Sequence, residues 1–126
     1  MEFEEITEKI IGLAYKVYNT LGFGFVESVY ENALSIELRR AGFIIQKQPA
    51  INVYYEGELV GKFKADIIVN EVVILELKSV QTIVREFEVQ LVNYLTATGK
   101  PVGLILNFGP SKVEIKRKVR VLPKEE

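Results

Sequence analysis

The sequence of 126 residues contains no cysteine and no histidine, and both absences restrict its chemistry. Without cysteine, the chain has no disulfides, thiolate zinc sites or cysteine nucleophiles. Without histidine, it has no histidine-dependent serine triad, histidine-based phosphodiester chemistry or histidine-ligated transition metal. Any catalysis must therefore use carboxylates, lysines, hydroxyls, amides or a hard cation bound through oxygen.

Long apolar runs and a strong net charge are also missing. No apolar run approaches the roughly 18 residues of a membrane-spanning helix, and the acidic N-terminus does not resemble a signal peptide. We therefore expect a cytoplasmic protein without membrane contact. The formal net charge of -1 does not by itself indicate a nucleic-acid binder. Basic residues do gather near the C-terminal end, where they form either a soluble edge strand or a phosphate-binding strip: Lys112, Lys116, Arg117, Lys118 and Arg120.

The length and composition are those of one small globular domain, which we expect to span residues 1–126. Apolar residues at helical spacing predict helices over residues 6–21 and 26–41, within a helical N-terminal part from 2 to 41. The second helix should bury Val26 on its inner side.

Residues 43–79 are predicted to form a three-stranded meander, with a kink at Pro49 and one continuous strand over residues 59–69. A third helix should follow over residues 82–98. An unbroken apolar run and an alternating segment then predict two final strands over residues 101–121.

The order of these elements predicts the fold class. A strand, a helix and a buried strand form a right-handed crossover, so the first of the final strands should lie parallel to the strand before the third helix. We expect an α/β fold with a mixed central sheet of about four to five strands flanked by helices. Residues 122–126 have the composition of a loose tail.

The most informative stretch runs from Lys64 to Lys78, where three charged residues interrupt two apolar strands. They are Asp66, Glu76 and Lys78. Burial of a single unpaired charge costs several kcal/mol, so a fold that places three charges here must pair them, use them to bind a metal, or both. The alternative to a metal site is a buried ion-pair network without chemistry.

The turn between these strands decides whether the acids can act together. A two-residue turn at Asn70-Glu71 would put Asp66 opposite Leu75, and Glu76 would then face the other side of the sheet. A shared site therefore requires a three-residue loop, or a bulge near Asp66, and we predict one of these.

Four motifs in order resemble a known superfamily. They are Gly24-Phe25-Val26-Glu27-Ser28-Val29-Tyr30, then Asp66, then Glu76-Leu77-Lys78, and finally Gln90-Leu91-Val92-Asn93-Tyr94. The first resembles the naming motif of the small prokaryotic GxxExxY proteins. The others resemble the D…E-x-K core of the PD-(D/E)xK nucleases and the Q-x-x-x-Y helix signature of RecB-like nucleases. The resemblance covers roughly residues 5 to 120 and implies a restriction-endonuclease-like core. Many relatives carry a histidine three residues before the helix glutamine, where this chain has Phe87.

The resemblance also implies roles for individual residues. Asp66, Glu76 and the main-chain carbonyl of Leu77 would bind Mg²⁺ or Mn²⁺, and Lys78 would position water or neutralise developing charge. Glu27 or Glu31 would add a carboxylate from the second helix, although both could instead lie on a solvated helix face. Gln90 and Tyr94 would support the site or contact the nucleic acid, or serve only as ordinary packing residues.

The implied function is divalent-metal-dependent hydrolysis of DNA phosphodiester bonds, in a repair, recombination or defence setting. The alternative is a catalytically inactive module that binds nucleic acid or a protein. A homodimer would supply the two active sites needed to cut both strands. A partner protein could supply targeting, since so small a domain has little surface left for sequence recognition.

Overall fold

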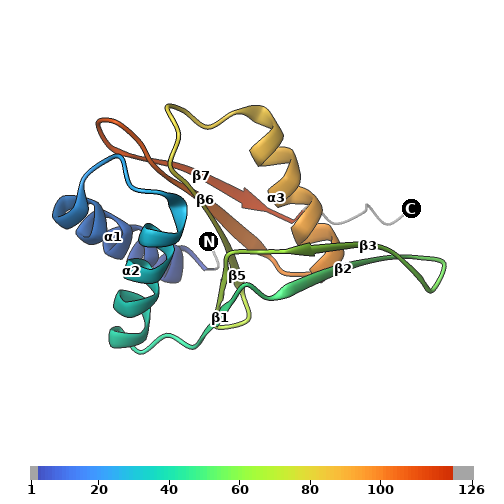
Figure 1. Ribbon diagram of the computed structural model, residues 1–126. Helices are drawn as coiled ribbons and strands as arrows, with labels where there is room; N and C mark the ends of the chain where they lie inside the picture. The colour runs from blue at the N-terminus through green and yellow to red at the C-terminus, as the bar shows by residue number, and fades with distance from the viewer. Residues whose placement is uncertain (1–2, 121–126) are drawn as a thin grey trace.

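The computed structural model describes residues 3–120, which form helices packed on a central sheet and a projecting hairpin (Figure 1). In chain order, the elements are α1 Glu4–Leu21, α2 Glu27–Arg40, β1 Ile45–Lys47, β2 Ala50–Tyr55, β3 Glu58–Lys64, β4 Ile67–Val69, β5 Val73–Lys78, α3 Arg85–Thr98, β6 Val102–Phe108 and β7 Val113–Val119. No helix among the described residues is both long and apolar enough to span a membrane.

The central sheet has five strands in the order β1-β4-β5-β6-β7. β5 and β6 are parallel, while the other neighbouring pairs are antiparallel. The α/β class and the mixed sheet are therefore confirmed. The predicted parallel pair around α3 is confirmed too, and β7 is the expected edge strand. Because parallel strands need a long connection, the loop and helix between β5 and β6 are the crossover.

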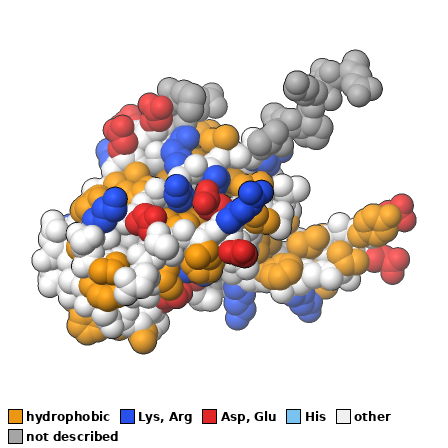
Figure 2. All heavy atoms as spheres, turned by 90° about the horizontal axis from the view of Figure 1, so that it is seen from above, with side chains coloured by type: hydrophobic (Ala, Val, Ile, Leu, Met, Phe, Trp, Pro, Cys, Tyr) orange, Lys and Arg blue, Asp and Glu red, His pale blue; other side chains and the backbone are white. Residues whose placement is uncertain are grey.

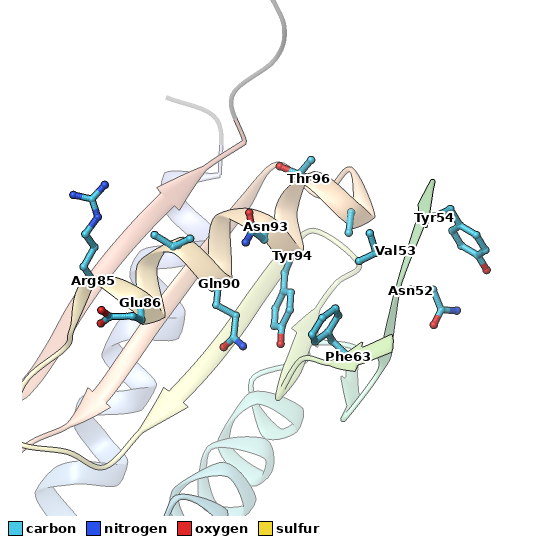
Figure 3. A pocket seen from close by; sticks show the side chains of 12 residues that line it. Asn52, Val53, Tyr54, Phe63, Arg85, Glu86, Gln90, Asn93, Tyr94 and Thr96 are labelled. Carbon is cyan, nitrogen blue, oxygen red and sulfur yellow. The ribbon is translucent and has the colours of Figure 1, made fainter. Parts of the chain in front are cut away.

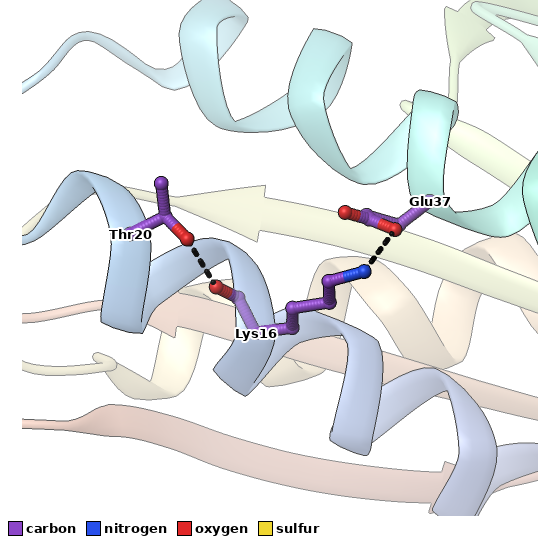
Figure 4. Close-up of polar contacts among 3 residues, drawn as sticks. All are labelled: Lys16, Thr20 and Glu37. Atoms are coloured by element: carbon purple, nitrogen blue, oxygen red, sulfur yellow. Dashed lines mark hydrogen bonds and ion pairs between the residues drawn. The ribbon is translucent and has the colours of Figure 1, made fainter.

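One face of the sheet is covered by α1 and α2. Their apolar stripes pack on alternate residues of the sheet strands in a cluster that includes Ile10, Leu34, Leu75 and Leu104. On the surface of the two helices, Lys16 Nζ lies 3.0 Å from Glu37 Oε1, and the Thr20 hydroxyl bonds the main-chain oxygen of Lys16 (Figure 4). The apolar contacts supply the stability of this layer, because an exposed ion pair contributes little.

The other face of the sheet is covered by α3 and the β2–β3 hairpin. Here Leu91 and Leu95 of α3 pack on Ile74 and Ile105 of the sheet. Gly103 of β6 allows the close approach, because a Cβ at this position would lie 2.6 Å from Leu91 Cδ1. α3 therefore packs closely on β6, the parallel neighbour of the strand that carries Glu76.

The prediction of one meander over residues 43–79 is wrong, because β2 and β3 leave the central sheet as a separate two-stranded sheet. The break occurs at paired positions in the two neighbouring segments, at Gln48-Pro49 in one and at Ala65-Asp66 in the other. Pro49 has no N–H to donate, Gln48 has a φ of 52°, and the predicted strand over 59–69 is interrupted at Ala65-Asp66. Hydrogen bonds from Ala65 N to Pro49 O and from Gln48 N to Asp66 O hold these two segments together through the bend.

Two smaller expectations also need correction, and a third falls on residues that the structure does not describe. Val26 is 69% exposed, because it is the residue before the first turn of α2 rather than part of its inner stripe. Ile83 and Val84 precede α3, which begins at Arg85. Glu2, residue 121 and the expected tail over residues 122–126 lie outside the described residues.

Candidate active site

The loop between β4 and β5 has the three residues that a shared site requires. Val69 pairs with Val73 and Ile67 with Leu75, which leaves residues 70–72 as the loop. Asn70 and Glu71 both have positive φ, and the Asn70 side chain accepts a bond from Ile44 N at 2.9 Å. The next pair along this register is Asp66 and Glu76. The prediction of a three-residue loop is therefore confirmed.

Asp66 and Glu76 are joined by two hydrogen bonds that cross between their segments. Asp66 N donates to Glu76 Oε2 at 2.9 Å, and Leu77 N donates to Asp66 Oδ2 at 2.7 Å. Each carboxylate thus has one oxygen held by a backbone amide of the other segment. This geometry brings the two acids to the same place and leaves Oδ1 of Asp66 and Oε1 of Glu76 outside that pair of bonds.

Glu76 is the most perturbed acid of the site. It is 6% exposed, and burial, followed by the charge of Asp66, raises its pKa to about 8. The hydrogen bond from Asp66 and the charge of Lys78 act in the opposite direction. At neutral pH, Glu76 therefore retains a proton unless a cation balances the two carboxylates.

Glu31 reaches the site through Gln48. Gln48 Nε2 donates to Glu31 Oε1 at 2.8 Å and lies 3.5 Å from Asp66 Oδ1. Burial and then the charge of Asp66 raise the pKa of Glu31. Glu27, one turn earlier on α2, is exposed, and its charge raises the pKa of both Glu31 and Glu76. The structure therefore brings Glu31 beside Asp66, while Glu27 acts through its charge.

Lys78 lies at the end of β5 and is held against α3. Its Nζ is 4.2 Å from the centroid of the Phe87 ring, within the range of a cation–π interaction. Its charge favours the ionised form of Glu76. Phe87 therefore orients the ammonium group from the position where many relatives are expected to carry histidine.

The two residues of the Q-x-x-x-Y pattern, Gln90 and Tyr94, differ in burial. Tyr94 is buried, its ring centroid is 5.9 Å from that of Phe63, and burial followed by the charges of Glu76 and Asp66 raises its pKa. Gln90 is exposed one turn earlier, and its side chain points in the same direction as Tyr94 (Figure 3). Within residues 3–120, no hydrogen bond joins Gln90 to either carboxylate.

The donor set fits a hard cation that keeps much of its water. Across the described residues, no group of three or more Asp, Glu, His or Cys side chains is arranged to hold a metal ion. Mg²⁺, however, commonly binds proteins through one or two carboxylates and retains several waters. Asp66 and Glu76 supply two such groups, and the main-chain oxygen of Leu77 is adjacent in sequence.

Sequence reasoning missed the residues that position the site. Gln48 bridges Glu31 and Asp66 from the end of β1, where no sequence motif marks it.

Asn107 is fully buried on β6, where its side chain accepts a bond from Val80 N at 2.9 Å and donates to Val80 O at 3.0 Å. Glu114 accepts bonds from Ile83 N and Thr82. Asn107 and Glu114 thus hold the segment between Lys78 and α3. The sequence signal that could have indicated this role was Asn107, a polar amide within the apolar run of β6.

A mixed sheet with paired acids at this position defines the restriction-endonuclease-like class. Residues 4–118 match the family model of the PD-(D/E)XK nuclease superfamily, and the chain therefore belongs to that superfamily. None of the curated proteins compared matches the sequence.

Solved structures show the same fold at low sequence identity. The chain is similar to the crystal structure of SSO0001, with a TM-score of 0.61 and 16% identity over 77% of this chain. It is also similar to an alkaline exonuclease from Laribacter hongkongensis, with a TM-score of 0.55 and 10% identity over 96% of this chain. The same exonuclease in complex with dAMP gives a TM-score of 0.56 and 11% identity over 96% of this chain. The matches cover 52% of SSO0001 and 72% of the exonuclease in both structures.

Proposed function

We propose that this protein is a divalent-metal-dependent nuclease that hydrolyses phosphodiester bonds of DNA, in repair, recombination or defence. The observation that carries the proposal is the convergence of Asp66 and Glu76 through the three-residue loop. The raised pKa of Glu76 supports it, because a cation between the acids would relieve their repulsion. Membership of the PD-(D/E)XK superfamily supports the reaction class.

Each residue has a role that follows from its position. Asp66, Glu76 and the Leu77 carbonyl would hold Mg²⁺ or Mn²⁺, with Glu31 close enough to bind its water. When bound, the cation lowers the pKa of the attacking water and offsets charge on the phosphate. Lys78, oriented by Phe87, stabilises the negative charge that develops during hydrolysis.

We also infer that the chain is one of the GxxExxY proteins, because the residues of that motif build the start of α2. Tyr30 is fully buried, stacks on Phe108 at 4.3 Å and donates its hydroxyl hydrogen to Gly22 O. Gly24 has a φ of 116°, which disfavours other residues. This packing fixes the loop that leads into α2 at Glu27.

The test is a cleavage assay on single-stranded, duplex, flap and four-way-junction DNA with Mg²⁺ or Mn²⁺. We expect cleavage by the wild-type chain and loss of cleavage in Glu76→Gln. Glu37→Gln is the matched control, because it neutralises a carboxylate of α2 that pairs with Lys16 instead (Figure 4). No product across the panel would reject the nuclease proposal.

A catalytically inactive module that binds nucleic acid or protein is the second candidate. One observation favours it, because each of the two acids accepts a backbone hydrogen bond from the segment of the other and so has a structural partner. Binding of DNA without cleavage in the same assay would support this candidate.

A further inference from the structure

A groove of about 840 Å³ runs between α3 and the β2–β3 hairpin (Figure 3). Its helical wall extends from Arg85 to Ala97, which at about 1.5 Å per residue corresponds to about 18 Å. The opposite wall is formed by the hairpin that leaves the central sheet. The groove is therefore a long channel along the helix that carries Gln90 and Tyr94.

The two walls combine apolar and hydrogen-bonding groups. On the hairpin, Val53 points towards α3 and Phe63 lies beside Tyr94, whereas Tyr54 points away (Figure 3). Phe63 remains 46% exposed, so part of its ring is open to a ligand. On the helix, the amide groups of Gln90 and Asn93 line the same space. An exposed aromatic ring beside amides suits a nucleobase, which needs a stacking surface and hydrogen-bonding partners.

Towards the sheet, the groove meets the candidate active site at Tyr94. This side chain lines the groove and packs in the same apolar cluster as Ala65, the residue before Asp66, and Ile74, two residues before Glu76. Neither acid lines the groove, so Tyr94 is the side chain through which the groove adjoins the site.

The other end of the groove carries Arg and Lys side chains beside Glu86 and Glu88. Arg85, Val89 and Asn93 also line a second hollow of about 510 Å³, which includes Lys118. Lys118 Nζ lies 2.6 Å from Glu88 Oε1, and this bond, together with the charges of Lys118, Lys116 and Arg85, lowers the pKa of Glu88. Lys and Arg side chains are interspersed with Asp and Glu side chains on the face seen in Figure 2. Arg85 lines both hollows, so its guanidinium is the cation at this end that a phosphate could contact.

We propose that this groove binds an unpaired strand of nucleic acid, on one side of the bond that is cut at Asp66 and Glu76. The proposal deepens the proposed function and rests on it for the position of the cut. An unpaired strand fits better than a duplex, because a duplex buries the base faces that Phe63 could stack on. A strand also matches the length of the groove, in which its phosphates reach Arg85 while its bases face Phe63 and Asn93.

The test measures binding without cleavage. Fluorescence anisotropy in EDTA compares a labelled 12-nucleotide single strand with a duplex of the same length. We expect the wild-type chain to bind the single strand at least about tenfold more tightly. Phe63→Leu keeps an apolar side chain but removes the ring, and should weaken binding by about fivefold or more, since stacking contributes about 1–3 kcal/mol per base.

Two further variants separate groove occupancy from folding. Leu59→Ala is the matched control, because Leu59 is 44% exposed on the same strand but does not line the groove. It should leave the affinity unchanged. Ala97→Glu adds bulk and negative charge from the helical wall at an exposed position and should weaken binding even if Phe63→Leu proves unstable in a thermal melt.

The results also distinguish the two proposals. Equal affinity for duplex and single strand, or unchanged affinity in both Phe63→Leu and Ala97→Glu, would overturn the groove assignment. If the chain cuts DNA but ignores both substitutions, only the groove assignment fails. If the expected binding pattern is seen without any cleavage, the groove assignment stands and the nuclease proposal fails.

Discussion

The two faces of the central sheet differ in what they bury. The face under α1 and α2 is covered by a continuous apolar cluster from both helices and four strands. The face under α3 holds a smaller apolar cluster and also carries Glu76, buried beside Asp66. Burial of an acid costs free energy, whereas burial of leucine supplies it. The comparison suggests that the first face stabilises the fold and that the second can therefore tolerate charged groups.

The largest expected effect comes from the charged face. Asp66→Asn keeps the size of the side chain but removes the negative charge that would bind the cation. We expect Mg²⁺-dependent cleavage to fall by about a thousandfold or more. The thermal midpoint in metal-free buffer should not fall, because the substitution also removes the repulsion on Glu76. A variant that cuts DNA at the wild-type rate would contradict the assignment.

The apolar face should show the opposite pattern. Leu34 of α2 is fully buried, so Leu34→Ala should lower the free energy of unfolding by about 2–5 kcal/mol. Denaturant melts measure this loss. At a temperature where the variant is folded, cleavage per folded molecule should remain close to wild type. A selective loss of activity would show that the two faces are coupled.

The pH dependence of stability should sharpen the contrast. Glu76 has a pKa of about 8 in the folded chain against an ordinary value of 4.5, so the folded state retains a proton that the unfolded state loses. Its stabilising contribution is complete below about 4.5 and is lost as the pH rises through 8. In EDTA, the free energy of unfolding should fall by up to about 1.4 kcal/mol per pH unit within this window.

Substitution identifies the group responsible for that slope. Glu76→Gln should remove most of it, whereas Glu37→Gln on the opposite face should retain it. Urea melts at several pH values measure both variants. An unchanged slope in Glu76→Gln would assign the proton to another group.

The smallest expected effect concerns the orientation of Lys78. Phe87→Leu removes the ring beneath the ammonium group while retaining an apolar side chain on α3. A cation–π contact contributes about 0.5–2 kcal/mol, so cleavage should fall by between about twofold and thirtyfold. Steady-state kinetics should show the loss in kcat rather than in KM. A change in KM alone would argue for a role in substrate binding.

The sequence predicted those parts of the fold that depend on local pattern. Helical spacing predicted α1 and α2, and the buried run predicted β6. The three-residue loop followed from parity, because Asp66 and Glu76 can share a side of the hairpin only if an odd number of residues separates their strands. That argument used only the alternation of side chains along a strand.

The remaining features depend on contacts between distant segments. Nothing local to residues 50–64 shows that these strands leave the sheet to pack on α3, because both halves of the predicted strand contain apolar residues that suit a sheet. Gln48 acquires its position from the bend at Pro49 and from Glu31 on another element. Phe63 belongs to the groove only because Tyr94 lies beside it.

The most direct test of the central claim is a titration with Mg²⁺ or Mn²⁺ that follows the thermal midpoint. The account predicts that the cation raises the midpoint of the wild-type chain and of Glu37→Gln, because it binds the folded state alone. It also predicts no such rise in Asp66→Ala or Glu76→Ala. Stabilisation by the cation that survives both of these substitutions would contradict the claim that Asp66 and Glu76 hold one metal ion together.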